Sequence, residues 1–315
     1  MFAFLFLVLP INSFAQAPGL SNGKGATITI NTLPDKKARP WWVAGGHVVG
    51  YSALLVGLNE AWYKNYPRTA FQVFNDSKEW LQMDKAGHGW TAYNMARGTA
   101  AVWRWSGVQG INKPHVLGAV SALSFLTIIE VLDAHSANWG WSWADVGANA
   151  VGTGLYLGEQ FAWTEQRIAF KFSSAPKKFP ADLQQRGNDL FGDNLLQRLL
   201  KDYNAQTYWL SANIKSFFPK ASVVPWLNVA VGYGANGMWG GFQNKAVAPD
   251  GTVTFNRTDI PRVRQWYLSP DVDFTKIKTG KRWVRTILFA ANAIKMPAPA
   301  LEFSSGKWRL HALHF

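Results

Sequence analysis

The spacing of apolar residues predicts helices in the first half of the chain. Between residues 40 and 172 apolar positions recur with the period of an α-helix, and four helices are expected. Their ranges are 41–63, 84–105, 113–137 and 143–172. Pro40 stands just before the first helix, and Asn112 and Ser142 are the expected N-caps of the third and fourth helices.

After residue 203 apolar and polar residues alternate, which is typical of β-strands with one buried face. The predicted strands are 207–218, 226–233, 264–277 and 301–315, the last being a hairpin that turns at residues 304–306. Helices are also expected at 189–203 and 282–295. The sequence therefore predicts an α+β fold, with an N-terminal bundle of about four helices followed by a C-terminal antiparallel β-sheet of about 4–6 strands.

The chain divides into five predicted parts. They are a signal peptide (1–15), a linker or arm (16–39), a helical domain (40–172), a linker with a short helix (173–203) and a β-rich domain (204–315). The apolar run at the start is too short to span a bilayer, and a small-x-small pattern follows it, so cleavage after Ala15 is expected. A leader of this kind predicts export to the cell envelope, in the periplasm or at the outer membrane.

Composition favours a membrane partner. The chain is 48% apolar and only 16% charged, has 17 tryptophans and carries a formal net charge of +13. Tryptophan favours the head-group zone of membranes, and a basic surface suits anionic lipid. Because no nucleic-acid motif is present, membrane lipid or an outer-membrane component is the expected partner, while the oligomeric state stays open. The sequence has no cysteine, so attachment through an acylated cysteine is not expected.

The alternating segment that ends in Phe315 is similar to the last strand of bacterial outer-membrane barrels. The predicted strands are fewer than the eight of the smallest such barrels. A curved sheet that lies against the helices or a membrane surface is therefore the preferred interpretation.

Polar residues are expected to meet at one level of the helical bundle. In an antiparallel bundle the start of the second helix, the end of the third and the start of the fourth lie together. The predicted polar cluster consists of Asp84, Lys85, His88, Glu130, Asp133, Asp145 and Asn149. His135 could join it from the following loop, and Lys85, Arg97 and Arg104 are candidate counter-charges.

Three interpretations of this cluster stay open. It is a structural polar network, a site for a lipid head group or small anion, or a site for metal or acid–base chemistry. In the third case the candidate catalytic or ligating residues are His88, Asp84, Glu130 and Asp145. No nucleophile elbow, zinc-protease helix or phosphate-binding loop is present, so no catalytic residue, metal or cofactor is assigned.

The motifs in this region resemble a known family. Asp84-Lys85-x-x-His88, Glu130-x-x-Asp133 and Ser142-x-x-Asp145-x-x-x-Asn149-x-x-Gly152 are similar to the envelope family "domain of unknown function 2279", the YfiM-like predicted periplasmic lipoproteins. The likeness covers about residues 80–160, and residues 202–211 resemble longer members. A more distant likeness is to VanZ-like membrane proteins. The resemblance implies an envelope location and no established activity.

Three functions follow as expectations. The first is a non-enzymatic, outer-membrane-associated envelope protein that binds lipid or a partner. The second is a metal- or acid/base-dependent hydrolase or transferase acting on an envelope lipid or glycan. The third is a VanZ-like inner-membrane helical protein, which would require residues 41–62 and 115–134 to span the bilayer.

Overall fold

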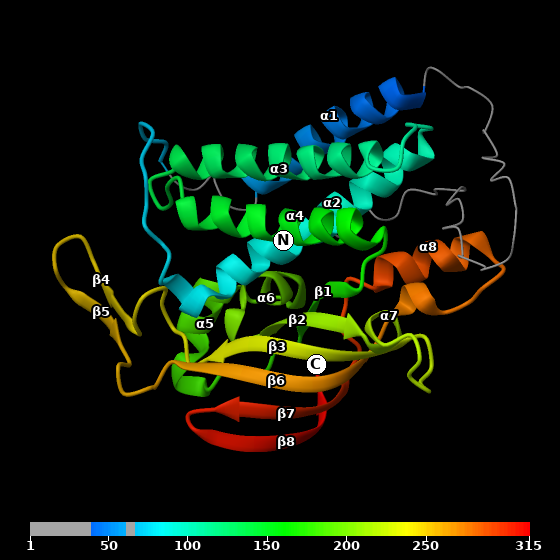
Figure 1. The fold of residues 1–315 in the computed structure, drawn as a ribbon. Coiled ribbons are helices and arrows are strands. Elements are labelled where there is room, and N and C mark those ends of the chain that lie inside the picture. Colours follow the sequence, from blue (N-terminus) through cyan, green and yellow to red (C-terminus); the bar gives the residue numbers. More distant parts are fainter. Residues whose placement is uncertain (1–38, 61–66) are drawn as a thin grey trace, which may run out of the picture.

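The computed structural model describes residues 39–60 and 67–315. The predicted signal peptide and almost all of the predicted arm lie outside the described residues. The fold is α+β, as predicted: the long helices form an upper layer, a curved antiparallel sheet forms the lower one, and α2 runs between them (Figure 1).

Four long helices build the upper layer. They are α1 (Arg39–Leu58), α2 (Met83–Trp105), α3 (Lys113–Ala134) and α4 (Trp143–Trp163). Small residues let α2 approach its neighbours closely, because a Cβ on Gly118 would lie 2.6 Å from Ala100 and one on Gly152 would lie 2.0 Å from the Gly89 carbonyl oxygen. The bundle core of alanine, Phe125, Leu126 and aromatic side chains thus holds the polar ends of three helices at one level.

Six strands form the main sheet. In spatial order they are β1 (Ile168–Ser174), β2 (Gln206–Asn213), β3 (Leu227–Asn236), β6 (Val263–Val272), β7 (Ala298–Ser304) and β8 (Lys307–His314). A separate hairpin pairs β4 (Lys245–Val247) with β5 (Val253–Asn256). The shorter helices are α5 (Gln184–Phe191), α6 (Leu195–Lys201), α7 (Ile214–Phe217) and α8 (Arg282–Ala291).

The prediction was wrong about the end of the fourth helix. It ends at Trp163 instead of residue 172, and Thr164 adopts a left-handed conformation (φ 55°). Residues from Ile168 onward then form β1, which pairs with β2 along its whole length. An apolar run of this length fits either a buried strand or a buried helix, and pairing with β2 decides for the strand.

Other predicted elements are shorter than expected. The strand expected at 207–218 ends at Asn213, whose side chain accepts a hydrogen bond from the backbone of Ser216 (2.9 Å) and starts α7. The strand expected at 264–277 ends at Val272, where Asp273 binds the backbone of Thr275 in the same way (2.9 Å). Asn and Asp side chains commonly turn the chain like this.

The other predicted helices are also shorter in the structure, or divided. The helix expected at 189–203 is two helices, separated at Gly192, whose φ of +89° no helix accepts. The helix expected at 282–295 ends at Ala291, and the third helix ends at Ala134. Asn112 occupies the N-cap of α3 but makes no capping bond with its side chain, whereas the cap at Ser142 is confirmed.

The helical layer and the sheet share one core. Trp90 of α2 packs with Phe172 and Tyr208 of the sheet, and its indole nitrogen donates to the Ala293 carbonyl (3.1 Å). Asn94 donates to the Phe170 carbonyl (3.0 Å). These contacts fix α2, and with it the candidate site, on the edge of the sheet.

The sheet is strongly curved, and its inner side carries charged and polar groups beside an apolar cluster of Trp209, Ala230, Tyr267 and Ala300. His314, at the end of β8, lies 3.3 Å from the Thr207 hydroxyl of β2, so the last strand returns towards the second. Inside the curve, Lys171 Nζ lies 2.7 Å from Asp271 Oδ2, and both side chains are fully buried. Ser211 donates to the same carboxylate oxygen (2.6 Å).

Candidate functional site

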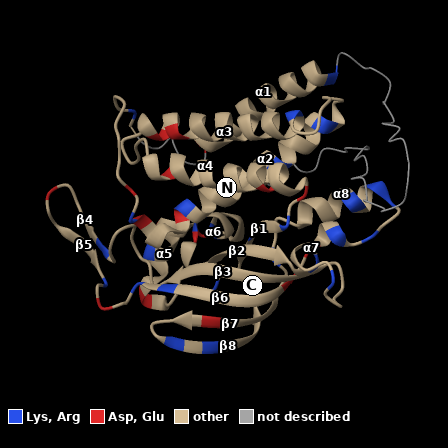
Figure 2. Cartoon of the chain, viewed as in Figure 1, with Lys and Arg blue, Asp and Glu red and all other residues tan. Residues whose placement is uncertain are grey.

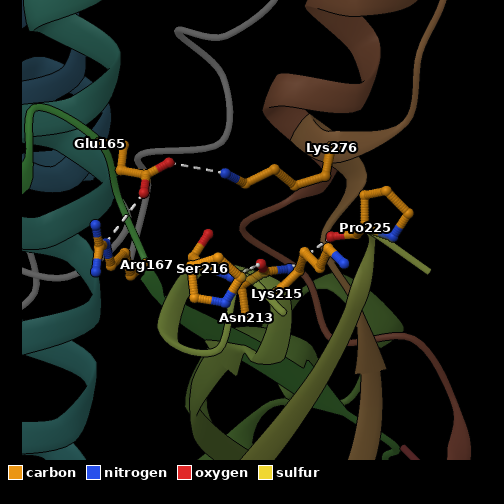
Figure 3. Close-up of a pocket in the computed structure, with 8 residues that line it drawn as sticks. Glu165, Arg167, Asn213, Lys215, Ser216, Pro225 and Lys276 are labelled. Carbon is orange, nitrogen blue, oxygen red and sulfur yellow. Dashed lines mark hydrogen bonds and ion pairs between the residues drawn. The ribbon is translucent and has the colours of Figure 1, made fainter. Parts of the chain in front are cut away.

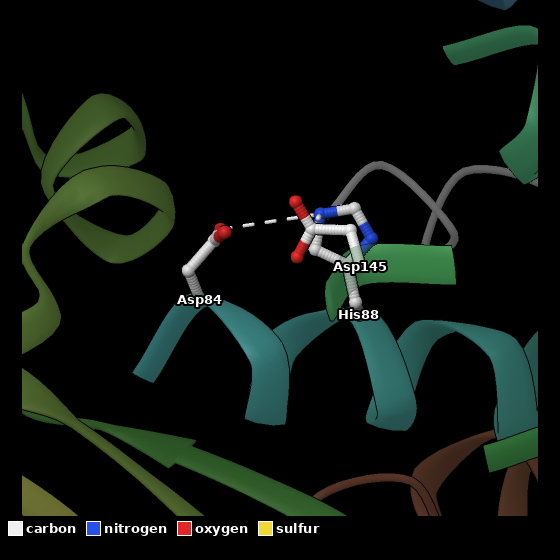
Figure 4. Close-up of side chains that lie close together, drawn as sticks. All are labelled: Asp84, His88 and Asp145. Carbon is white, nitrogen blue, oxygen red and sulfur yellow. Dashed lines mark ion pairs between the residues drawn. The ribbon is translucent and has the colours of Figure 1, made fainter. Parts of the chain in front are cut away.

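The ends of α2, α3 and α4 meet around His88. Figure 4 shows His88 with Asp84 and Asp145. Its Nδ1 is 3.2 Å from Asn149 Oδ1 and 3.7 Å from Glu130 Oε1. Its Nε2 is 3.7 Å from Asp145 Oδ1 and 4.0 Å from Asp84 Oδ1. Both nitrogens of one imidazole ring therefore face oxygen acceptors.

Lys85 forms the second centre of the cluster. Its ammonium lies 2.5 Å from Asp76 Oδ2, 2.8 Å from Asp145 Oδ1 and 3.0 Å from Asp84 Oδ2. With a side-chain exposure of 12%, this lysine is held in place by carboxylates from three separate segments. Charge-assisted bonds of this kind are stronger than neutral ones when water is largely excluded.

The local backbone explains how these side chains are positioned. Ser142 caps α4 by accepting from the Asp145 amide (3.0 Å), and its hydroxyl donates to Asp76 Oδ1 (2.5 Å). Before α2, three successive residues that are not glycine have left-handed φ values. These are Trp80, Leu81 and Gln82, at 46°, 50° and 64°. Such backbone outliers concentrate at functional sites, and here the turn sets the direction in which α2 begins.

The electrostatics separate the acids into two kinds. Burial raises the pKa of Asp84, but His88, Lys85 and a hydrogen bond from Tyr203 (2.8 Å) act against it and lower that pKa to about 2. Burial raises the pKa of Asp145 to about 7, although His88 and Lys85 oppose the shift. Attraction to His88 and Lys85 therefore prevails over burial at Asp84, whereas burial prevails at Asp145.

Glu130 is the least satisfied group of the cluster. Its side chain is 1% exposed, and neither carboxyl oxygen has a hydrogen-bond partner. Burial raises the pKa of Glu130 to about 8, and the neighbouring acids add to the effect while His88 opposes it. For His88 itself, burial lowers the pKa, but Asp145, Asp84 and Glu130 outweigh burial and raise it.

Some predicted participants lie elsewhere. Asp133 lies near enough to the cluster to raise the pKa of Glu130. His135 is exposed and faces the Thr69 carbonyl (3.2 Å). Arg97 donates to the Phe289 carbonyl (2.7 Å), and Arg104 contacts His115. Lys85 is thus the counter-charge, and neither arginine serves as one.

Sequence reasoning missed two participants, Asp76 and Tyr203. Asp76 precedes α2 in a loop, and Tyr203 opens the short turn Tyr203–Ala205. Neither residue lies on a helical face, so periodicity gives no signal for them. Tyr203 does lie in the segment 202–211 that resembles longer family members, which was the one indication available.

The arrangement can support two kinds of chemistry. An imidazole between carboxylates can accept and donate protons as a general base or acid. The same donors can bind a cation, since ligand atoms of Asp84, His88 and Asp145 all lie within 4.8 Å of one another. The side chains of Asp84, His88 and Asp145 are 25%, 19% and 8% exposed, so solvent can reach the group.

A pocket of about 320 Å³ lies away from this cluster, at the end of the sheet near α7 (Figure 3). Its charged lining residues bind one another or the backbone. Glu165 pairs with Arg167 (3.0 Å) and Lys276 (2.9 Å), and Lys215 donates to the Ala221 carbonyl (2.6 Å). None of the predicted site residues lines it, and we assign it no ligand.

Comparison with known proteins gives one match. No curated protein matches the chain, and no solved structure matches it. Residues 73–157 match the family described as "Predicted periplasmic lipoprotein (DUF2279)". This description agrees with an exported cell-envelope protein, whereas the VanZ-like likeness gains no support from the match. Over residues 73–157, which include every residue of the predicted polar cluster, the resemblance to the DUF2279 family is confirmed.

Proposed function

We propose that this envelope protein associates with a membrane, in first place the outer membrane, and contacts lipid through the outward face of its curved sheet. One observation carries the proposal. The inner side of the sheet holds buried charged and polar side chains together with Trp209 and Tyr267, while the exposed outer side is apolar. A water-soluble antiparallel sheet shows the opposite distribution.

The outer apolar band is continuous across five strands. In register it contains Leu210, Val231, Leu268, Leu301 and Leu310, each paired with the next. A parallel aromatic row consists of Trp266, Phe303 and Trp308. All eight side chains are exposed, and Leu310 reaches 78%. A contiguous apolar patch of this kind marks an interaction surface.

On β1 and at the start of β2 the same outer face is covered by α2, where Phe172 and Tyr208 pack against Trp90. From β6 to β8 no described helix lies over it (Figure 1). Lipid would supply there the apolar contact that α2 supplies to β1 and β2. Burying these side chains contributes about 25 cal/mol per Å² of apolar surface.

Helix α1 adds a second apolar surface. Among its twenty residues only Val43 is buried, while Trp41 and Trp42 are 80% and 77% exposed. Two described helices, α1 and α3, are long and apolar enough to cross a membrane. α3, however, is partly buried against α2 and α4, and it carries Glu130 into the polar cluster. A tryptophan pair beside Arg39 suits the membrane head-group zone.

Charge supports the same partner. The middle sections of α1, α3, α4 and β3 are nearly free of charge, and lysine and arginine gather at the ends of elements, notably around α8 (Figure 2). Exposed Trp283 and Ile287 accompany Arg282 on that helix. With a net charge of +13, the protein is expected to prefer anionic lipid.

The proposal predicts reduced vesicle binding when the outer apolar band is made polar. In a triple variant with Val231→Ser, Leu268→Ser and Leu310→Ser, partitioning onto vesicles of phosphatidylcholine and phosphatidylglycerol should fall at least about tenfold, because each lost apolar side chain weakens burial in lipid. Co-sedimentation with the vesicles measures the bound fraction of each variant. The matched control has Val247→Ser and Val253→Ser, which are exposed valines of the β4–β5 hairpin.

Two results would contradict the proposal. One is equal sedimentation of the triple variant and the wild type. The other is release of the mature protein from cells by osmotic shock without detergent. Separation of the two membranes on a density gradient then distinguishes outer from inner membrane.

A second candidate function is hydrolysis or group transfer on an envelope lipid or glycan. The observation in its favour is an accessible imidazole whose Nε2 lies 3.7 Å from Asp145 Oδ1 and 4.0 Å from Asp84 Oδ1. His88→Ala and Asp145→Ala should each abolish complementation of a deletion strain while circular dichroism shows folded protein. Full complementation by both folded variants would exclude catalysis at this site.

A further inference from the structure

We propose that Asp84, His88 and Asp145 bind a divalent transition-metal ion, of which zinc is the best fit. The ion would lie between His88 Nε2 and one carboxylate oxygen of each aspartate. This inference is independent of the membrane contact and holds whether or not the site is catalytic.

The first support is the orientation of the imidazole ring. Asn149 Oδ1 lies 3.2 Å from Nδ1, so Nδ1–H donates to that amide oxygen. This fixes Nε2 as the nitrogen that faces Asp84 Oδ1 and Asp145 Oδ1. Metal-ligating histidines are held in this way, with the second ring nitrogen donating to an oxygen. The Nε2 edge of the ring thus faces two carboxylates, which is the arrangement that a bound cation requires.

The second support is Glu130, whose carboxyl group lies on the other side of the imidazole ring, beside Nδ1. Its carboxyl group is 1% exposed and has no hydrogen bond, and Oε1 lies 3.7 Å from His88 Nδ1. A buried carboxyl group without a partner is costly. A cation bound at Nε2 would lower that cost, because its positive charge attracts the Glu130 carboxyl group from the other side of the ring.

The distances fit with a small contraction. Two ligands on a tetrahedral ion, each about 2.0–2.2 Å from it, lie roughly 3.4 Å apart. The corresponding separations from Nε2 are 3.7 Å and 4.0 Å. Side-chain rotations that bring the carboxylate oxygens about half an ångström closer to Nε2 would therefore close the site. The imidazole donor favours zinc over magnesium or calcium, which prefer oxygen ligands alone.

Lys85 is the competing cation. It lies 2.8 Å from Asp145 Oδ1 and 3.0 Å from Asp84 Oδ2, while its contact with Asp76 (2.5 Å) leaves it a partner if the other two are lost. An ion must therefore displace part of this interaction. Removing the lysine charge should strengthen metal binding, which is the opposite of what a purely structural ion-pair network predicts.

The test is calorimetric titration of the metal-free mature protein with zinc chloride. Wild type should bind one equivalent, and His88→Ala should bind at least about 100-fold more weakly. Asn149→Ala should lose about 10–100-fold, since it only orients the ring. Lys85→Met should bind about tenfold more tightly. His135→Ala, which removes an exposed histidine outside the cluster, is the matched control and should bind like wild type.

Circular dichroism checks that each variant is folded, and if His88→Ala is not, Asp145→Asn and Asn149→Ala carry the comparison. X-ray absorption of the zinc-loaded protein should show one imidazole among oxygen ligands. Absence of saturable binding to wild type at millimolar zinc overturns the proposal. So does an equal loss of affinity in His135→Ala and His88→Ala, or weaker binding in a folded Lys85→Met.

Discussion

Gly152→Ala should lower the free energy of unfolding by about 2 kcal/mol or more, although alanine is the better helix former. A Cβ at this position would lie 2.0 Å from the Gly89 carbonyl oxygen and 2.9 Å from Gly89 Cα. Both atoms belong to the backbone of α2, so neither can rotate away, and α4 must move as a body. Overpacking of this kind typically costs about 1–3 kcal/mol and sometimes more.

The matched control stands two residues later in the same helix. At Gly154 a Cβ would meet no atom within 4 Å. Gly154→Ala should therefore stabilise the protein by up to about 1 kcal/mol through helix propensity alone. Urea denaturation of both variants measures the difference. Equal stability of the two would show that α2 and α4 are not in the close contact described here.

The same substitution should also disturb the polar cluster. Gly89 follows His88 directly, and Gly152 lies one helical turn after Asn149. Separating the two helices would lengthen the distances from the imidazole to Asn149 and Asp145. Zinc affinity should therefore fall in Gly152→Ala and stay unchanged in Gly154→Ala, which links the packing of the bundle to its chemistry.

The sequence predicted the site better than the boundaries of the elements. Asp84, His88, Glu130, Asp145 and Asn149 were placed together because helix periodicity fixes which residues share a face. Antiparallel packing then fixes which ends meet. Both rules need only the sequence of one helix or of helices that follow one another in the chain. Asp76 and Tyr203 reach the cluster through irregular segments, and only the tertiary fold positions them.

The errors in the predicted fold also concern features that only the tertiary structure decides. Nothing in the sequence near Thr164 resembles a glycine or proline stop, so the end of α4 could not be distinguished from its continuation into β1. The β4–β5 hairpin was missed because its strands are short and half polar. The reversed faces of the sheet could not be predicted either, because alternation gives the two faces of a strand but does not tell which one is covered.

Asp271→Asn should destabilise the protein strongly, with an expected loss of about 3–5 kcal/mol. The carboxylate lies 2.7 Å from Lys171 and 3.9 Å from Lys295, and all three side chains are fully buried. Removing its charge would leave two ammonium groups inside the curve of the sheet. Asp259→Asn is the matched control, since that aspartate pairs with Arg257 at the surface and little change is expected.

The pH dependence separates this electrostatic cause from a loss of packing. Burial already lowers the pKa of Lys171, with Asp271 opposing the shift, so Asp271→Asn should lower that pKa further. Between the folded pKa and the unfolded value of about 10.5, the unfolded chain binds more protons, and stability rises with pH. The deficit of Asp271→Asn should therefore shrink as the pH is raised from 7 towards 10 in chemical denaturation, and adding Lys171→Met should recover part of it at pH 7. A deficit that is constant with pH would mean that shape, and not charge, holds the polar interior together.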